Sequence, residues 1–254
     1  MATGILPIIV GEGTKYISYV ENGNKSYDVK CKLGVFSECG DFESEPIQYP
    51  GEEAAIKDLN DSRIKKTFKS FVGDYLQIPP MFSNTKHKGK PLHTYARKNI
   101  KIDREPKNRK IYDIKFNYLE HDILCFSVIC SSGTYIWTLV QDISYQWNIH
   151  SCLYELHRSE VKPFNNFPLI DLERLRDIKL DEYIISIPQM LNGLEKLVFT
   201  DIEINKLYKG IPIVIREGVS NHSLYMITDK NNNFHGVGTI ANNSIYPKRL
   251  MKRW

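Results

Sequence analysis

Strict alternation of apolar and polar side chains over residues 27–33 is the feature that most limits the possible folds. The apolar positions are Tyr27, Val29, Cys31 and Leu33, and the polar ones are Asp28, Lys30 and Lys32. Successive side chains of a strand point to opposite faces of its sheet, so this pattern predicts a half-buried strand. Residues 111–116 and 123–130 alternate in the same way and predict two further strands.

Helical spacing appears between these predicted strands. Residues 64–75 bring four apolar side chains to one face, and the Pro79-Pro80 pair lies beyond them because proline cannot continue a helix. A second helix is predicted at about 135–147, a short one within 92–98, and a short strand near 152–158. Together these patterns predict an α+β fold with a mixed or antiparallel sheet flanked by helices.

The sequence changes in character from Phe199 onward. Short apolar runs at 211–215, 224–227 and 236–240 are separated by turns rich in glycine and asparagine. Such spacing is typical of short strands. We therefore expect a main domain over residues 1–197 and a small all-β module over residues 198–254.

Positive charge is concentrated in two segments. The chain has 34 Lys and Arg against 30 Asp and Glu. Residues 86–110 hold ten of the basic residues and two acids, and residues 201–254 hold eight basic residues and four acids. Clustered cations are what phosphate contacts need, so nucleic-acid binding is one interpretation and a solvated basic surface is the other.

Several classes of protein are disfavoured. No apolar stretch approaches the roughly 18 residues of a membrane span, and the run at 5–10 contains Pro7 with no basic residue before it, so neither an anchor nor a signal is expected. The five cysteines form no C-x-x-C pattern. We therefore expect no disulfide scaffold, no metal site, no membrane partner and a cytoplasmic setting.

Several segments resemble, in the right order, the TruB-type tRNA pseudouridine-55 synthases. Residues 1–16 are similar to the run that follows the family's catalytic Leu-Asp-Pro. The other matching segments are Lys25-Ser26-Tyr27 with Leu33-Gly34 and Asp41, then Gln77-Ile78-Pro79-Pro80-Met81-Phe82-Ser83 with Tyr95-Ala96-Arg97, then Gly133-Thr134-Tyr135-Ile136, and finally Tyr246-Pro247-Lys248-Arg249-Leu250.

The resemblance implies a pseudouridine synthase-like fold with a C-terminal PUA-like module. Enzymes of this family isomerise uridine 55 in the T-loop of tRNA to pseudouridine without a metal or an organic cofactor. The target base is flipped out of the loop, and a carboxylate helps to break the glycosidic bond. The expected partner of this chain is therefore the T-arm of tRNA, and the chain is expected to be a monomer.

The resemblance also implies roles for individual residues. Tyr27, Tyr135, Leu156 and Asp41 match substrate-binding positions. The expected contacts to the RNA backbone are Lys86, Lys88, Lys90, Arg97 and Arg158. Taken without the resemblance, Tyr27 and Leu156 fit a core, Tyr135 fits a helix entry and Asp41 fits a turn.

Departures from the family pattern concern the catalytic groups, so no catalytic residue is assigned. The family's catalytic Asp would lie two positions before Met1. Trp137 stands where the family has an Arg that pairs with that Asp, and it brings no charge. Ser37-Glu38-Cys39 replaces a Thr-Asp-Thr pattern. Asp41 and Asp142 are the only substitute carboxylates worth naming, and each fits a structural role better.

Three hypotheses follow from these matches and departures. The chain is a synthase whose sequence starts at an internal methionine, or a degenerate homologue that binds tRNA without catalysis. The third is an unrelated α+β protein with a basic loop. Trp137 favours the second, since a wrong start codon does not explain it, and a Leu-Asp-Pro codon string upstream of Met1 would support the first.

Overall fold

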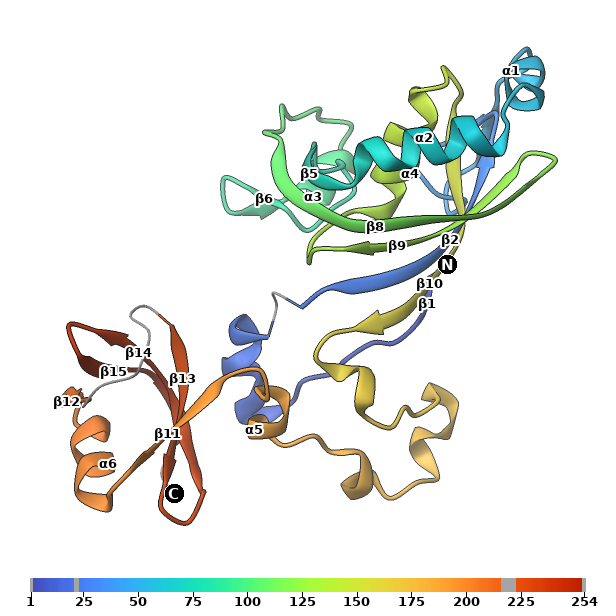
Figure 1. Ribbon diagram of the computed structural model, residues 1–254. Helices are drawn as coiled ribbons and strands as arrows, with labels where there is room; N and C mark the ends of the chain where they lie inside the picture. Colours follow the sequence, from blue (N-terminus) through green and yellow to red (C-terminus); the bar gives the residue numbers. More distant parts are fainter. Residues whose placement is uncertain (1, 21–22, 216–222, 253–254) are drawn as a thin grey trace. The chain divides into compact units, whose positions relative to one another are not determined.

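The computed structural model describes residues 2–20, 23–215 and 223–252, and it divides into two compact units (Figure 1). Unit 1 comprises residues 1–6 and 23–162, and unit 2 comprises residues 7–22 and 163–254. Each unit has its own sheet and its own apolar core. The domain boundary expected at residue 197 concerns the family's modules and stays a prediction.

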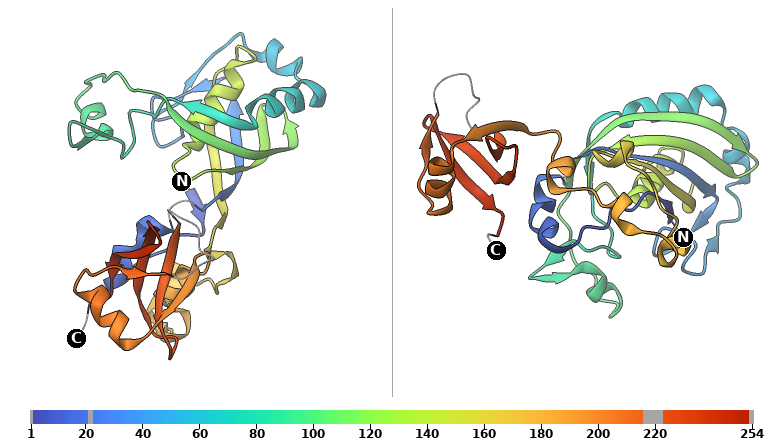
Figure 2. Two further views of the ribbon diagram at one scale, coloured as in Figure 1. Left: turned by 60° about the vertical axis from the view of Figure 1, so that its left-hand side comes forward. Right: turned by 90° about the horizontal axis from the view of Figure 1, so that it is seen from below.

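Unit 1 is built on a six-stranded sheet in the order β1-β10-β2-β9-β8-β5, and Figure 2 shows this unit from two further sides. The strands are β1 (Ala2–Gly4), β2 (Lys25–Leu33), β5 (Gly73–Gln77), β8 (Lys107–Glu120), β9 (Ile123–Cys130) and β10 (Ser151–Val161). β1 runs parallel to β10 and every other neighbouring pair is antiparallel. The predicted mixed sheet is confirmed, and the four strands predicted from alternation or spacing all belong to it.

Two helices, α2 (Asp61–Phe71) and α4 (Ile136–Tyr145), cover one face of this sheet (Figure 1). The side chain of Asn60 caps α2 by accepting a hydrogen bond from the backbone N–H of Arg63 at 3.0 Å. Ile64 and Phe68 are the buried residues of α2. The ring of Phe68 packs 5.1 Å from that of Phe126 on β9, so the predicted apolar face of the helix does contact the sheet.

The end predicted for the first helix is wrong. The spacing predicted a helix to residue 75, but α2 ends at Phe71 and Val72 has extended backbone. Gly73 has φ +112°, a conformation that side chains disfavour, and it redirects the chain into β5. The strand then buries Tyr75 and Gln77, which a continued helix would place on different faces.

Short elements complete unit 1. They are β3 (Val35–Phe36) paired with β4 (Ile47–Gln48), α1 (Glu53–Lys57), β6 (Lys86–His87) paired with β7 (Lys90–Pro91), and α3 (Leu92–Ala96). α3 confirms the short helix predicted within 92–98. The β6–β7 hairpin and α3 carry the first half of the basic segment.

Unit 2 contains a five-stranded sheet in the order β11-β13-β14-β15-β12. Its strands are β11 (Glu195–Phe199), β12 (Ile213–Val214), β13 (Leu224–Asp229), β14 (Phe234–Ala241) and β15 (Ser244–Leu250). The helical elements are the 3-10 helices η1 (Gly11–Tyr19), η2 (Phe164–Asn166), η3 (Leu172–Arg176) and η4 (Leu180–Tyr183) and the α-helices α5 (Ile187–Met190) and α6 (Asp201–Tyr208).

Helix α6 was not predicted from the sequence. Thr200 and Glu203 form a reciprocal capping box at its start, a signal that is present in the sequence. Within the described ranges of the chain, no helix is long and apolar enough to cross a membrane.

The core of unit 1 should depend strongly on Phe68. Phe68→Ala should lower the free energy of unfolding of this unit by about 3–5 kcal/mol, because it leaves a cavity against the sheet. Leu76→Ala is the matched control, since Leu76 is 71% exposed, and it should change stability by less than about 0.5 kcal/mol. Urea unfolding followed by circular dichroism gives both values, and equal effects would contradict the packing described.

Candidate active site

Tyr27 and Leu156 lie on neighbouring strands and face the same side of the sheet. The register between β2 and β10 pairs Tyr27 with Arg158 and Val29 with Leu156, and both Tyr27 and Leu156 pack against the core of unit 1. Burial raises the pKa of the Tyr27 phenol, while the charge and hydrogen bond of Arg158 oppose that rise. The phenol is therefore neutral at physiological pH and has a cation beside it.

Arg158 is fixed by the chain that follows β1. Its Nε donates a hydrogen bond to the carbonyl oxygen of Ile5 at 2.6 Å. Gly4, with φ +103°, lies directly beside Arg158, and a Cβ at residue 4 would come within 2.3 Å of the Arg158 carbonyl oxygen. This close backbone approach requires glycine and keeps Arg158 within the sheet, next to Tyr27.

Tyr135 is held by a buried amide. Gln77, which is 1% exposed, accepts a hydrogen bond from the backbone N–H of Tyr135 at 2.8 Å and donates one to the Tyr135 carbonyl oxygen at 2.9 Å. Tyr135 is the N-cap residue of α4 and makes no side-chain capping bond there. The amide of β5 therefore fixes the backbone at the entry of α4, from which the Tyr135 side chain extends.

A second pair of residues, Tyr75 and Asp142, supports the Gln77 amide that holds Tyr135. The hydroxyl of Tyr75 donates a short hydrogen bond to Oδ2 of Asp142, and Gln77 Nε2 lies 3.3 Å from the same hydroxyl. Burial raises the pKa of Asp142, and the bond from Tyr75 opposes that rise. Asp142 thus ends a hydrogen-bond chain that leads to Tyr135 through Gln77, which is the structural role expected for it.

Trp137 sits on the first turn of α4 and packs against both Tyr135 and a glycine. Its ring centroid is 5.1 Å from that of Tyr135, with the rings edge to face. Gly40 has φ +82°, and a Cβ there would come within 2.8 Å of the Trp137 ring. The indole Nε1 is buried and has no hydrogen-bond partner among the residues the structure describes.

A pocket of about 220 Å³ opens beside these rings. It is lined by Phe82, Ser83, Asn84, His93, Tyr135 and Trp137. Three aromatic rings surround a few hydroxyl, amide and imidazole groups, a lining that suits a planar heteroaromatic ring. None of these six residues carries a carboxylate, so the pocket by itself supplies binding groups and no carboxylate nucleophile.

Asp41 lies next to Gly40 and therefore near Trp137. Its Oδ1 accepts a hydrogen bond from the backbone N–H of Glu43 at 3.1 Å, and the Ser37 hydroxyl donates to the Asp41 carbonyl oxygen at 2.6 Å. Asp41 also bridges to Leu153 of β10. Its carboxylate stabilises a turn of the loop.

The basic residues expected to contact RNA fall into two places. Lys86, Lys88 and Lys90 lie on the β6–β7 hairpin and Arg97 follows α3, all four exposed and, within the described part of the chain, in no salt bridge. Thr85 connects this segment to the pocket, since its Oγ1 lies 3.3 Å from the hydroxyl of Tyr135. Arg158 stands apart from them, beside Tyr27.

Sequence reasoning did not single out Gln77 and His93 as parts of the site. Gln77 belonged to the Gln-Ile-Pro-Pro segment, and a polar residue just before a proline pair was the available signal. His93 gave no signal, because the place of α3 beside Tyr135 in the pocket lining is set by tertiary contacts.

The clamp on Tyr135 should be costly to remove. Gln77→Ala removes the partner of the Tyr135 backbone N–H and one of the two hydrogen bonds to the Tyr135 carbonyl oxygen, which keeps the bond from the Leu139 backbone N–H, so unit 1 should lose about 1–3 kcal/mol of stability. Gln48→Ala, at an exposed glutamine of β4, should cost less than about 0.5 kcal/mol. Chemical unfolding measures the stability of both variants. Equal stabilities would show that the hydrogen bonds from Gln77 to Tyr135 contribute nothing to the stability of unit 1.

Asp142 should make the stability of unit 1 depend on pH. The pKa of Asp142 is raised in the folded state, so the folded chain holds the carboxyl proton more tightly than the unfolded chain does. The free energy of unfolding of unit 1 therefore falls as pH rises above about 4 and Asp142 ionises. Asp142→Asn keeps an acceptor for Tyr75 and cannot ionise. The free energy of unfolding of Asp142→Asn, relative to that of the parent chain, should therefore increase between about pH 4 and pH 7. Urea unfolding measures this difference, and a difference that does not change with pH would contradict the prediction.

Comparisons with known proteins agree with the resemblance found in the sequence. The family model described as "TruB family pseudouridylate synthase (N terminal domain)" matches residues 1–136, and that described as "Pseudouridine synthase II TruB, C-terminal" matches residues 196–251. The tRNA pseudouridine synthase B of Nitrosospira multiformis is 33% identical over 261 residues, which cover 99% of this chain and 83% of that protein. The same enzyme of Clostridium novyi is 32% identical over 256 residues, covering 99% and 86%.

Solved structures agree at the level of fold. The crystal structure of a Cbf5-Nop10-Gar1 complex contains a chain that matches with a TM-score of 0.69 at 18% identity, covering 98% of this chain and 73% of that one. A chain in the structure of an H/ACA RNP bound to a substrate RNA containing 2'-deoxyuridine matches with the same score at 17% identity, covering 99% and 73%. On the strength of the two family models and the identity to these relatives, the chain belongs to the TruB family of pseudouridylate synthases.

Proposed function

We propose that this chain is built to bind the T-arm of tRNA and to act on uridine 55 in the T-loop, the reaction of the TruB-type enzymes that it resembles. In that isomerisation the bond between N1 of uracil and C1′ of the ribose breaks, the base turns, and C5 joins C1′. Tyr27, Tyr135, Leu156 and Asp41 are the proposed substrate contacts. The relatives named tRNA pseudouridine synthase B support tRNA as the substrate class.

The observation that carries the proposal is the aromatic pocket beside Gln77 together with a group of exposed cations. A flipped base costs a few kcal/mol of unstacking, and aromatic faces return roughly 1–3 kcal/mol per base. The rings of Phe82, Tyr135 and Trp137 line the pocket. The exposed side chains of Lys86, Lys88, Lys90 and Arg97 suit contacts to the RNA backbone phosphates that neighbour a base bound in the pocket.

Trp137 limits the chemistry available. An indole offers one N–H donor and no charge, whereas the family's Arg at this place pairs with the catalytic carboxylate. A part-buried carboxylate without a cation tends to keep its proton, which weakens it as a nucleophile. We therefore propose that turnover is very low while residue 137 is Trp.

The second candidate is tRNA binding without catalysis, and Trp137 is the observation that favours it. The aromatic lining of the pocket and the exposed Lys86, Lys88, Lys90 and Arg97 do not depend on residue 137 carrying a charge. Both candidates share the remaining parts of the proposal: a monomer in the cytoplasm, with a synthase-type domain over residues 1–197 and a PUA-like RNA-binding module over residues 198–254. The five cysteines, all free, fit a reducing compartment.

Binding should weaken steeply as salt rises, because cations on the protein displace counterions from the RNA. Replacing Lys86, Lys88 and Lys90 together by Ala should make the slope of log affinity against log salt shallower by about 2–3. The matched control replaces the exposed Lys57, Lys66 and Lys69 of α1 and α2 by Ala and should leave the slope nearly unchanged. Fluorescence anisotropy with a T-arm hairpin gives these slopes, and equal slopes in both triple variants would remove the hairpin from the interface.

Activity should need two changes at once. Four proteins are compared: the printed chain, the chain with Leu-Asp-Pro added before Met1, Trp137→Arg, and both together. Only the last should give measurable pseudouridine, since the carboxylate and its cation act as a unit and their effects are strongly non-additive. Mass spectrometry of a T-arm hairpin is the assay.

The T-arm affinity of each of the four proteins is the control for folding. Clear activity of the printed chain would overturn this account. Asp41 would then be the first carboxylate to replace.

A further inference from the structure

His93 lines the aromatic pocket, and the proposed function gives it no role. It lies on α3 and shares the lining with the rings of Tyr135 and Trp137. A ring nitrogen in such a lining can meet the edge of a bound base. Whether that nitrogen donates or accepts a hydrogen bond then decides which bases fit.

His93 is anchored through its backbone and its side chain. Its backbone N–H donates to the carbonyl oxygen of Ser83 at 3.1 Å, and its Nδ1 lies 3.3 Å from the same oxygen. The backbone N–H of Leu92, a residue that is 2% exposed, donates to the carbonyl oxygen of Thr85 at 2.8 Å. α3 is therefore held against residues 83–85, and the imidazole has a defined position in the pocket.

The partner of Nδ1 fixes the tautomer of His93. A carbonyl oxygen only accepts hydrogen bonds, so the contact with Ser83 assigns the proton to Nδ1. In a neutral imidazole with this proton on Nδ1, the other nitrogen is an acceptor. Nε2 has no hydrogen-bond partner among the residues that the structure describes. The pocket thus contains an acceptor of fixed role that is available to a ligand.

The other polar groups of the pocket are adaptable or already committed. The hydroxyl of Tyr135 lies 3.3 Å from Thr85 Oγ1, and either of these two groups can be the donor. The side-chain amide of Asn84 both donates and accepts. The hydroxyl of Ser83, a residue that is 5% exposed, donates to the carbonyl oxygen of Pro80 at 2.7 Å. None of these groups discriminates between a donor and an acceptor on a base as Nε2 of His93 does.

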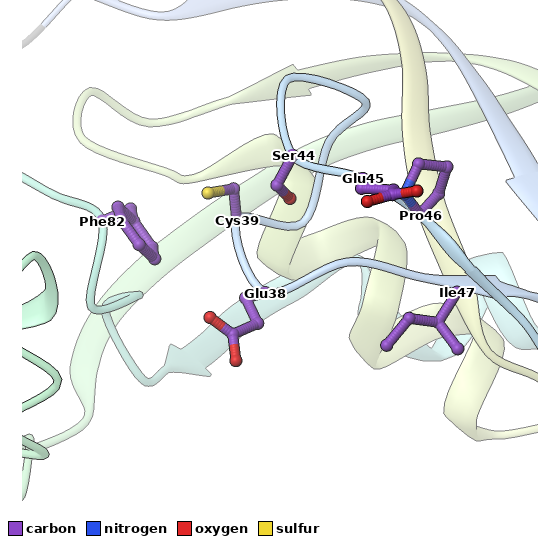
Figure 3. Close-up of a pocket in the computed structure, with 7 residues that line it drawn as sticks. All are labelled: Glu38, Cys39, Ser44, Glu45, Pro46, Ile47 and Phe82. Carbon is purple, nitrogen blue, oxygen red and sulfur yellow. The ribbon is translucent and has the colours of Figure 1, made fainter.

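The carboxylates of Glu38 and Glu45 belong to a different hollow. That hollow has a volume of about 490 Å³ and shares only Phe82 with the aromatic pocket. Figure 3 shows Phe82 on one side of it and Glu45 on the other. No carboxylate acceptor therefore lines the aromatic pocket, and the imidazole nitrogen is the acceptor that a base meets there.

Uracil and cytosine differ at the atom that such an acceptor meets. N3 of uracil carries a hydrogen and donates, whereas N3 of cytosine carries a lone pair and accepts. Two acceptors that face each other make no hydrogen bond. A site built to pair with an N–H therefore rejects the analogue that lacks it.

We propose that His93 is a specificity-determining residue that selects uridine over cytidine at the target position, with its Nε2 accepting a hydrogen bond from N3–H of the flipped uracil. This proposal rests on the proposed function, because it takes the aromatic pocket as the place of the target base. It requires no charge on residue 137, so it applies to the chain with Trp137.

The test compares T-arm hairpins with uridine or cytidine at the target position, at about pH 8, above the range in which imidazoles usually titrate. The printed chain should bind the uridine hairpin about tenfold more tightly, the scale of one base-edge contact. His93→Gln brings in an amide that both accepts and donates. Its affinity for the uridine hairpin should stay within about threefold, and its affinity for the cytidine hairpin should rise about tenfold.

His87→Gln is the matched control, because it makes the same exchange at a histidine of β6 that does not line the pocket. It should keep the tenfold preference for uridine. Any effect of cytidine on the RNA loop itself is common to all three proteins and cancels when their preferences are compared.

Three results would overturn the role of His93 and leave T-arm binding standing. The first is salt-dependent binding of the printed chain without a preference for uridine. The second is a preference that survives His93→Gln. The third is a preference lost only through weaker binding of the uridine hairpin, which would mark His93 as a structural residue. Failure of the printed chain to bind either hairpin would overturn the proposed function as well.

Discussion

The buried amide of Gln77 is the contact on which the geometry of the candidate site depends. It bonds to both backbone polar groups of Tyr135: the N–H, which would cost about 1–3 kcal/mol if it were left unpaired, and the carbonyl oxygen, which also accepts a bond from the Leu139 backbone N–H. Tyr135 begins α4, and Trp137 follows on the first turn of that helix. The position of both aromatic rings relative to the sheet is therefore set from β5, through a side chain that is itself restrained by Tyr75 and Asp142.

The packing of Trp137 explains how an uncharged ring is accommodated beside an acidic loop. Gly40 leaves room for the indole, because any side chain there would collide with it. The cost is an indole N–H that is buried without a partner among the described residues. The same packing leaves Asp41 without a cation from residue 137, and its carboxylate is used to stabilise a turn instead.

Much of the fold could be predicted from the sequence because its strands alternate clearly and its helices have one apolar face. The strands at 27–33 and 123–130 were found this way, and so was the face of α2. The end of α2 was missed because its apolar spacing continues past Phe71, and only the backbone conformation of Gly73 stops it. α6 was missed although Thr200 and Glu203 signal its start.

The candidate site was predictable only in part. Tyr27, Tyr135 and Leu156 came from the resemblance, whereas the hydrogen bonds of Gln77 and the place of Phe82 in the pocket depend on segments that approach one another only in three dimensions. Trp137 gives the most direct test of the central claim, that its pocket receives the flipped uridine. Its emission, obtained as the difference between the printed chain and Trp137→Phe, can be followed during titration with a T-arm hairpin. A hairpin with the target uridine should change this emission and one with an abasic site there should not, whereas equal changes would contradict the claim.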